Sequence, residues 1–149
     1  MVALETACEG GRQLRGVASG RSPASAVGTV SVTRHDAAGT WLIALGGEHD
    51  LSTAALLEEE TIGVWPCAAL VVVDLSGAAF MDSTVVHWLI SAKRELEACG
   101  TGALRIVEGP GGSFAARLFG LLSVGDVLVC YRTRRDAFGQ ESALGVTAD

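Results

Sequence analysis

The chain has 149 residues and a formal net charge of −6, with 11 Lys and Arg against 17 Asp and Glu. This length suits a single domain, and the negative charge argues against direct binding to nucleic acid. Hydrophobic residues make up 49% of the chain and charged residues 19%, and no apolar run approaches the ~20 residues that cross a bilayer. The composition therefore favours a soluble α/β domain and excludes an integral membrane protein.

The amino terminus carries Glu5 and Glu9 and lacks the compact apolar core of a secretory signal, so the cytoplasm is the expected compartment. The cysteines stand singly, without the paired spacing of a zinc site or the density of a disulfide scaffold. We expect Cys67, Cys99 and Cys130 to be small buried hydrophobic side chains, and we expect neither a metal nor a cofactor.

Residues 1–27 are rich in Gly, Ala, Ser and Arg and show neither helical nor alternating periodicity, which predicts a flexible extension before a folded domain at 28–149. Thr29–Arg34 and Thr40–Leu45 then read as strands joined by the turn 37–39. This pair is expected to be an antiparallel hairpin at one side of a sheet.

Gly46 and Gly47 are expected to end the second strand. The polar residues 48–50 would then form a loop, followed by a helix from Thr53 to about Gly63. Either Asp50 or Ser52 can cap that helix.

Residues 70–75 form a continuous run of β-branched and leucine residues around one aspartate, the pattern of a central strand covered on both faces. Small residues then loosen the chain over 77–79. Asp82, Ser83 and Thr84 supply side-chain oxygens where a helix must begin.

Ser83 is a candidate switch residue on these grounds. A phosphate on its hydroxyl would face the free N–H groups and the positive end of the helix dipole. The alternative is that Asp82 and Ser83 are ordinary N-cap residues, worth about 1 kcal/mol of helix stability and without a signalling role.

The helix after Ser83 is predicted from an apolar stripe, and Gly100 should end it in a left-handed conformation. The stripe consists of Val85, Leu89, Ala92, Leu96 and Cys99, widened by Val86 and Ile90. His87 lies away from the stripe and Trp88 at its edge. Trp88 is therefore either a partly exposed partner contact or a side chain packed against a neighbouring helix.

The remaining elements are a strand at Ala103–Val107, a helix carrying Phe114 and Leu118, and a last strand at Val127–Tyr131. The glycine-rich run 108–113 between the first two lacks the lysine of a phosphate-binding loop, so it is interpreted as a strand-to-helix turn.

A final helix is expected around Asp136–Leu144. The arginines at 132, 134 and 135 are interpreted as its solvated start rather than as a phosphate receptor.

Alternation of strands and helices implies right-handed crossovers and an α/β fold. We expect a mixed β-sheet of about five strands with helices packed mainly on one face. An enzyme would need a nucleophile with an activating base, or a set of metal ligands, and the isolated histidines supply neither. We therefore expect no catalytic activity.

Two motifs in the right order give a family resemblance. The run Gly47–Ala54 reads Gly-Glu-His-Asp-Leu-Ser-Thr-Ala, and Asp74–Thr84 reads Asp-Leu-Ser-Gly-Ala-Ala-Phe-Met-Asp-Ser-Thr. Together they resemble the STAS domain of anti-sigma factor antagonists, and the likeness covers about residues 28–140. The STAS fold is thus implied.

The resemblance also implies a function. In that family a partner anti-sigma factor kinase phosphorylates the serine directly after the motif aspartate, here Ser83, and dephosphorylation by a serine phosphatase restores binding. The acidic loop with Glu48 and Asp50 would lie beside this serine. Partner contacts are accordingly expected from six residues: Asp82, Thr84, His87, Trp88, Glu48 and Asp50.

The chain departs from the family where Val85 and His87 replace two glycines. Glycines there let a partner's backbone approach closely. Their loss supports a second interpretation, a STAS scaffold or ligand-sensing module that is no longer phospho-switched. Nucleotide binding, associated with the family at large, ranks last because the sequence shows no phosphate cradle.

Overall fold

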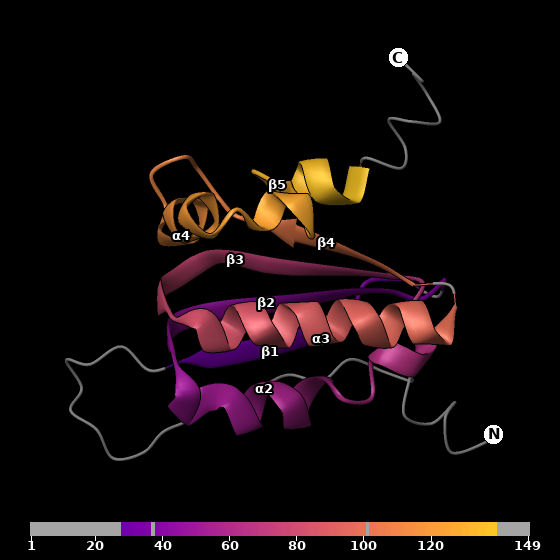
Figure 1. Ribbon diagram of the computed structural model, residues 1–149. Coiled ribbons are helices and arrows are strands. Elements are labelled where there is room, and N and C mark those ends of the chain that lie inside the picture. Colours follow the sequence, from indigo (N-terminus) through magenta and orange to yellow (C-terminus); the bar gives the residue numbers. More distant parts are fainter. Residues whose placement is uncertain (1–27, 37, 101, 140–149) are drawn as a thin grey trace.

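The computed structural model describes residues 28–36, 38–100 and 102–139. The extension predicted over 1–27 and the predicted helical residues 140–144 lie outside this part of the chain. Five strands form one sheet in the order β1-β2-β3-β4-β5 (Figure 1). They are β1 (Thr29–Arg34), β2 (Thr40–His49), β3 (Leu70–Met81), β4 (Ala103–Val107) and β5 (Val129–Tyr131).

The sheet is mixed. β1 and β2 pair antiparallel, which confirms the predicted hairpin, whereas β3 is parallel to both β2 and β4, and β5 is parallel to β4. The parallel strands need crossovers, which contain α2 (Ala54–Thr61), α3 (Ser83–Cys99) and α4 (Phe114–Leu122). The predicted α/β fold, with helices mainly on one face, is confirmed.

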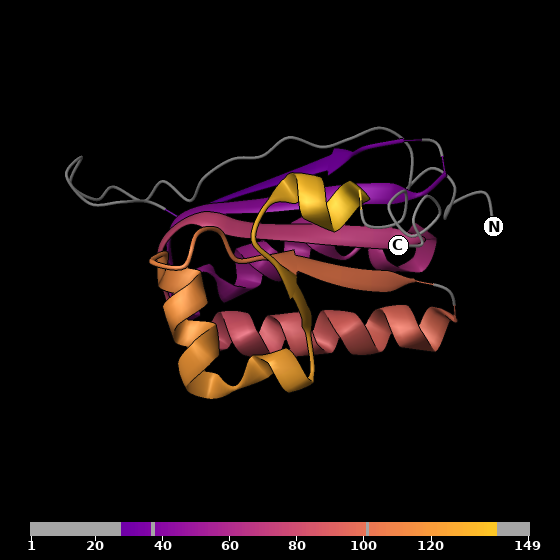
Figure 2. The same ribbon diagram turned by 90° about the horizontal axis from the view of Figure 1, so that it is seen from above.

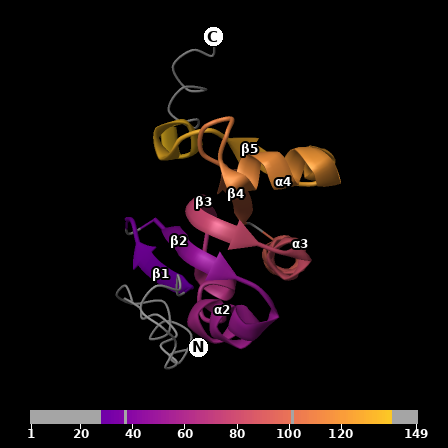
Figure 3. The same cartoon turned by 90° about the vertical axis from the view of Figure 1, so that its left-hand side faces the viewer.

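The two faces of the sheet are covered unequally. Alternate residues of β3, Val71, Val73 and Leu75, lie in the main core beneath α2, α3 and α4. On the opposite face, Val72 packs against Ala137 of the helical segment 134–139. Figures 2 and 3 show that segment, in yellow, on the other side of the sheet from α3.

β2 and β3 both extend farther than predicted. β2 continues through Gly46 and Gly47 to His49, and β3 runs on to Met81 rather than ending near residue 75. The added residues pair with each other, with register shifts at the glycines of β2. A Cβ atom at Gly46 would come within 2.9 Å of Thr29 Oγ1 on β1, so any larger residue there would force the Thr29 side chain to shift.

Some element ends agree with the predictions and others differ: α2 covers Ala54–Thr61 rather than Thr53 to about Gly63, and β5 begins at Val129 rather than Val127. Gly100 closes α3 at φ 93°, and Ser113 caps α4 by accepting a hydrogen bond from the N–H of Ala116 at 3.1 Å. Cys99 is exposed, so the expectation that it is buried is wrong. It stands on the last turn of α3, where all residues after the buried Leu96 are exposed. Cys130 is half-buried, and the side chain of Cys67 is not described.

Candidate functional site

The start of α3 presents Ser83 to solvent. Asp82 is the N-cap, and its carboxylate accepts a hydrogen bond of 2.9 Å from the N–H of Thr84. Ser83 is the first helical residue and is exposed, whereas Asp82 and Thr84 are half-buried. Of the two predicted caps, Asp82 therefore does the capping and leaves the Ser83 hydroxyl at the surface.

Buried residues on either side fix this turn. Met81, the last residue of β3, is 1% exposed, and Val85 on the first turn of α3 is 0% exposed. The exposed Ser83 thus lies between two residues, Met81 and Val85, whose side chains are packed in the main core. Because Val85 points inward, it does not occupy the surface where a partner would approach Ser83.

The acidic loop after β2 lies beside this turn. His49 pairs with Met81 across β2 and β3, and the N–H of Asp82 donates a hydrogen bond of 3.3 Å to the carbonyl oxygen of His49. Asp50 and Asp82 therefore follow directly from neighbouring strand ends. Glu48, the residue before His49, is exposed.

Asp50 is also a cap. Its carboxylate accepts hydrogen bonds from Ser52 N at 2.8 Å and Ser52 Oγ at 2.6 Å, at the start of the short 3-10 helix Leu51–Thr53 that precedes α2. Asp50 thus caps the 3-10 helix, whereas α2, for which Asp50 and Ser52 were the expected caps, has Thr53 as its N-cap residue and no side-chain cap hydrogen bond. Its side chain remains half-buried beside the Asp82 turn.

Sequence reasoning missed the role of His49. Its side chain is 0% exposed, with Nδ1 3.0 Å from Thr53 Oγ1 and Nε2 2.9 Å from the carbonyl oxygen of Gly46. Burial lowers the pKa of His49 below its usual value, although hydrogen bonds to backbone carbonyls act in the opposite direction. The inward alternation of Trp41, Ile43 and Leu45 continues to His49, and this period of two was the available signal.

The two predicted contact residues farther along α3 point in different directions. His87 is exposed and stands four residues after Ser83, on the same side of the helix. Trp88 is only 7% exposed and contacts Trp65, with ring centroids 6.2 Å apart. Of the two alternatives for Trp88, the partly exposed partner contact is therefore wrong, and the indole is packed against a neighbouring element, the 3-10 turn Trp65–Cys67.

A second polar pair lies on the other face of the sheet. Asp74 of β3 is 5% exposed and accepts hydrogen bonds from Ser76 N and Oγ. Arg134 Nε lies 2.5 Å from Asp74 Oδ2. Burial raises the pKa of Asp74, but the Ser76 hydrogen bonds and Arg134 outweigh it and hold the pKa below its usual value. Arg134 therefore attaches the segment 134–139 to the sheet.

Within the described residues, no cluster of three or more His, Cys, Asp or Glu side chains is arranged to hold a metal ion. In the same part of the chain, no helix has the length and apolar content needed to cross a membrane.

Comparisons with known proteins agree with this fold. The model of the STAS domain family matches residues 30–137. A crystal structure of an anti-sigma factor antagonist from Mycobacterium paratuberculosis is similar with a TM-score of 0.63 and 26% sequence identity, over 80% of this chain and 96% of that one. No match was found among curated protein sequences.

Two further structures are alike in fold. The anti-sigma factor antagonist SpoIIAA in its unphosphorylated form has a TM-score of 0.58 and 19% identity, covering 76% of this chain and 96% of its own. The phosphorylated form of the Bacillus cell fate determinant SpoIIAA has a TM-score of 0.55 and 18% identity, covering 75% and 98%.

Proposed function

Because the chain belongs to the STAS domain family, we propose that it is an anti-sigma factor antagonist whose docking to an anti-sigma factor kinase is controlled by phosphorylation of Ser83. The observation that carries this proposal is the exposed Ser83 hydroxyl on the first residue of α3. Similarity to an anti-sigma factor antagonist at 26% identity supports it. Unmodified Ser83 permits docking, and phosphoserine prevents it, which regulates transcription that depends on the sigma factor.

Electrostatics at the turn favour a switch. A phosphate brings a charge of about −2 at neutral pH, and the amino end of a helix stabilises nearby negative charge by about 0.3–1 kcal/mol. The carboxylate of Asp82 on the adjacent residue and that of Asp50 on the neighbouring loop repel it. The protein therefore tolerates the phosphate, while the partner meets a surface with more concentrated negative charge.

The docking surface in this proposal surrounds Ser83. It comprises the half-buried Asp82, Thr84 and Asp50 together with the exposed Glu48 and His87. Trp88 is left out because its indole is buried. A kinase partner would contact the Ser83 hydroxyl together with these flanking groups. A serine phosphatase would remove the phosphate and restore the form that docks.

The replacement of glycine by Val85 costs little in this scheme, since Val85 is enclosed in the core. His87 is the substantive departure, because its exposed imidazole stands one turn from Ser83. We expect His87 to select a partner with a matching recess.

Incubation of the full chain with its kinase partner and ATP, followed by mass spectrometry, tests the acceptor. We expect phosphate on Ser83 and none on Ser83→Ala, whereas Thr84→Ala, which removes the neighbouring hydroxyl, should still be modified. Phosphate on another residue, or none, contradicts the proposal.

A binding assay separates the switch from the alternative of a scaffold or ligand-sensing module. We expect Ser83→Ala to bind the kinase as the unmodified protein does and Ser83→Asp to bind much more weakly, because a carboxylate introduces part of the phosphate's charge. Equal binding of both variants would instead favour a module without a phospho-switch. That alternative is supported by His87 in place of the family glycine.

A further inference from the structure

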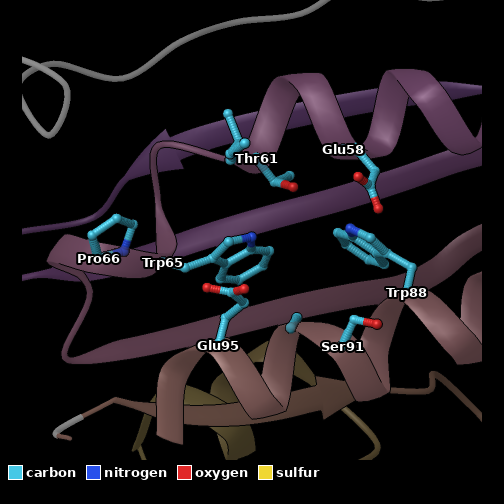
Figure 4. A pocket seen from close by; sticks show the side chains of 9 residues that line it. Glu58, Thr61, Trp65, Pro66, Trp88, Ser91 and Glu95 are labelled. Carbon is cyan, nitrogen blue, oxygen red and sulfur yellow. The ribbon is translucent and has the colours of Figure 1, made fainter. Parts of the chain in front are cut away.

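A cavity of about 300 Å³ lies between α2 and α3, and none of its lining residues belongs to the Ser83 turn or to residues 48–50. Figure 4 shows the indoles of Trp65 and Trp88 side by side in this cavity. Their ring centroids are 6.2 Å apart, with the planes at 60°. The tilt lets both aromatic surfaces contribute to the cavity wall.

The next feature of the cavity is its pair of indole N–H groups. Trp65 and Trp88 are each 7% exposed, yet neither indole N–H donates a hydrogen bond to another described residue. In Figure 4 both indole nitrogens lie on the side of the rings that faces Thr61 and Glu58. In the described residues the buried indole nitrogen without a partner is that of Trp41, so the N–H groups of Trp65 and Trp88 are open to solvent or to a ligand in this cavity.

Two carboxylates flank the indoles from different helices. Glu58 comes from α2 and Glu95 from α3, and Figure 4 shows their carboxylates on opposite sides of the two rings. Both residues are exposed, and neither forms an ion pair with a cation in the described part of the chain. The cavity thus has negative charge on both sides of its aromatic wall.

We propose that this cavity binds a small organic cation that also carries an oxygen acceptor, such as a hydroxyalkyl ammonium compound. The negative faces of the indoles attract a cation, especially a quaternary ammonium group. Glu58 and Glu95 add Coulomb attraction, and the indole N–H groups donate to the oxygen of the ligand. The volume lies at the small end of the range for ligand pockets, about 300–1,000 Å³. The site is independent of the role proposed for Ser83.

Choline is the first probe, since it combines a quaternary ammonium group with a hydroxyl. The indole N–H signals of the three tryptophans in the full chain would be followed by NMR during a choline titration. We expect the signals of Trp65 and Trp88 to shift together and to saturate, with a dissociation constant on the order of 1 mM. Trp41 is the internal control, because its indole nitrogen is enclosed elsewhere in the core.

Isosteric variants test the charges. Glu58→Gln and Glu95→Gln should each weaken choline binding about threefold, as expected for a partly exposed charge pair. Glu59→Gln is the matched control on α2, since Glu59 is exposed and does not line the cavity. It should leave the affinity unchanged. All of these positions are exposed, so the fold should tolerate the changes.

The neutral carbon isostere of choline, in which carbon replaces the nitrogen, should bind at least tenfold more weakly, since each tenfold corresponds to about 1.4 kcal/mol. Equal binding of the isostere, or fixed Trp65 and Trp88 signals up to about 10 mM choline, would overturn the proposal. Ser83→Asp should bind choline normally, so failure of the phospho-switch and failure of this site give different results.

Discussion

The backbone N–H of Asp82 donates a hydrogen bond of 3.3 Å to the carbonyl oxygen of His49, which joins the start of α3 to the end of β2. The imidazole of the same His49 contacts Thr53 and Gly46 below the surface. The exposed turn that carries Ser83 is therefore hydrogen-bonded to the backbone of a buried histidine. We expect that protonation of His49 alters both the stability of the fold and the geometry of this turn.

The lowered pKa of His49 should appear in the pH dependence of the free energy of unfolding. Its pKa in the folded protein lies below the ordinary 6.5, because burial disfavours the charged ring. Below about pH 6.5 the unfolded chain therefore binds more protons, and stability falls as pH falls, by at most about 1.4 kcal/mol per pH unit. The loss should continue until the folded-state histidine is itself protonated. Urea unfolding at about pH 7.5 and about pH 5 measures it.

His49→Gln should abolish most of this slope, even if it lowers stability at neutral pH. His87→Gln is the control, because His87 is exposed. An unchanged slope in His49→Gln would show that another group controls the transition.

Asp82 has a capping role and an electrostatic role that two variants separate. Asp82→Ala should destabilise the protein by about 1 kcal/mol, because the hydrogen bond to Thr84 N is lost, whereas Asp82→Asn should retain the cap. Thermal unfolding measures both. If Asp82 also repels the phosphate, Asp82→Asn should reduce the difference in kinase binding between unmodified and phosphorylated protein. Equal destabilisation by both variants would contradict the capping assignment.

Arg134 should stabilise the packing of segment 134–139. Its side chain is 51% exposed, so solvent screens the pair with Asp74, and Arg134→Gln should cost only about 1 kcal/mol at neutral pH. Since the pKa of Asp74 is lowered, the stability from its ionised form is present above pH 3.8 and is lost as pH falls below it. Carboxyl NMR should show the Asp74 pKa rising in Arg134→Gln. Arg135→Gln, at an exposed neighbouring position, should leave it unchanged.

Two cysteines should react at very different rates. Cys99 is exposed on the last turn of α3, whereas burial, reinforced by Glu108, raises the pKa of Cys130 to about 12. The thiolate is the reactive form, so iodoacetamide at neutral pH should label Cys99 well before Cys130. Peptide mass spectrometry measures the order. Faster labelling of Cys130 would mean that β5 opens readily at the edge of the sheet.

The sequence by itself determined most of the fold and the position of Ser83. Thr29–Arg34 and Ala103–Val107 form strands at the predicted bounds, since runs of β-branched and apolar residues are local signals. α3 (Ser83–Cys99) was predictable for the same reason, because its apolar residues recur every three or four positions and each cap residue adjoins the helix end that it closes. The sequence left open whether Asp82 or Ser83 caps the helix, because both are good N-cap residues, and the structure assigns the cap to Asp82.

Only the tertiary structure decided which distant residues meet. The pairing of β2 with β3 extended both strands through glycines that usually end a strand, because the hydrogen bonds of a neighbouring strand outweigh a weak local preference. Asp74 and Arg134 form an ion pair although they are 60 residues apart in the sequence. Trp65 of the 3-10 turn contacts Trp88 of α3. Such contacts depend on how the helices pack on the sheet. A local sequence pattern does not specify which residues distant in the chain come into contact.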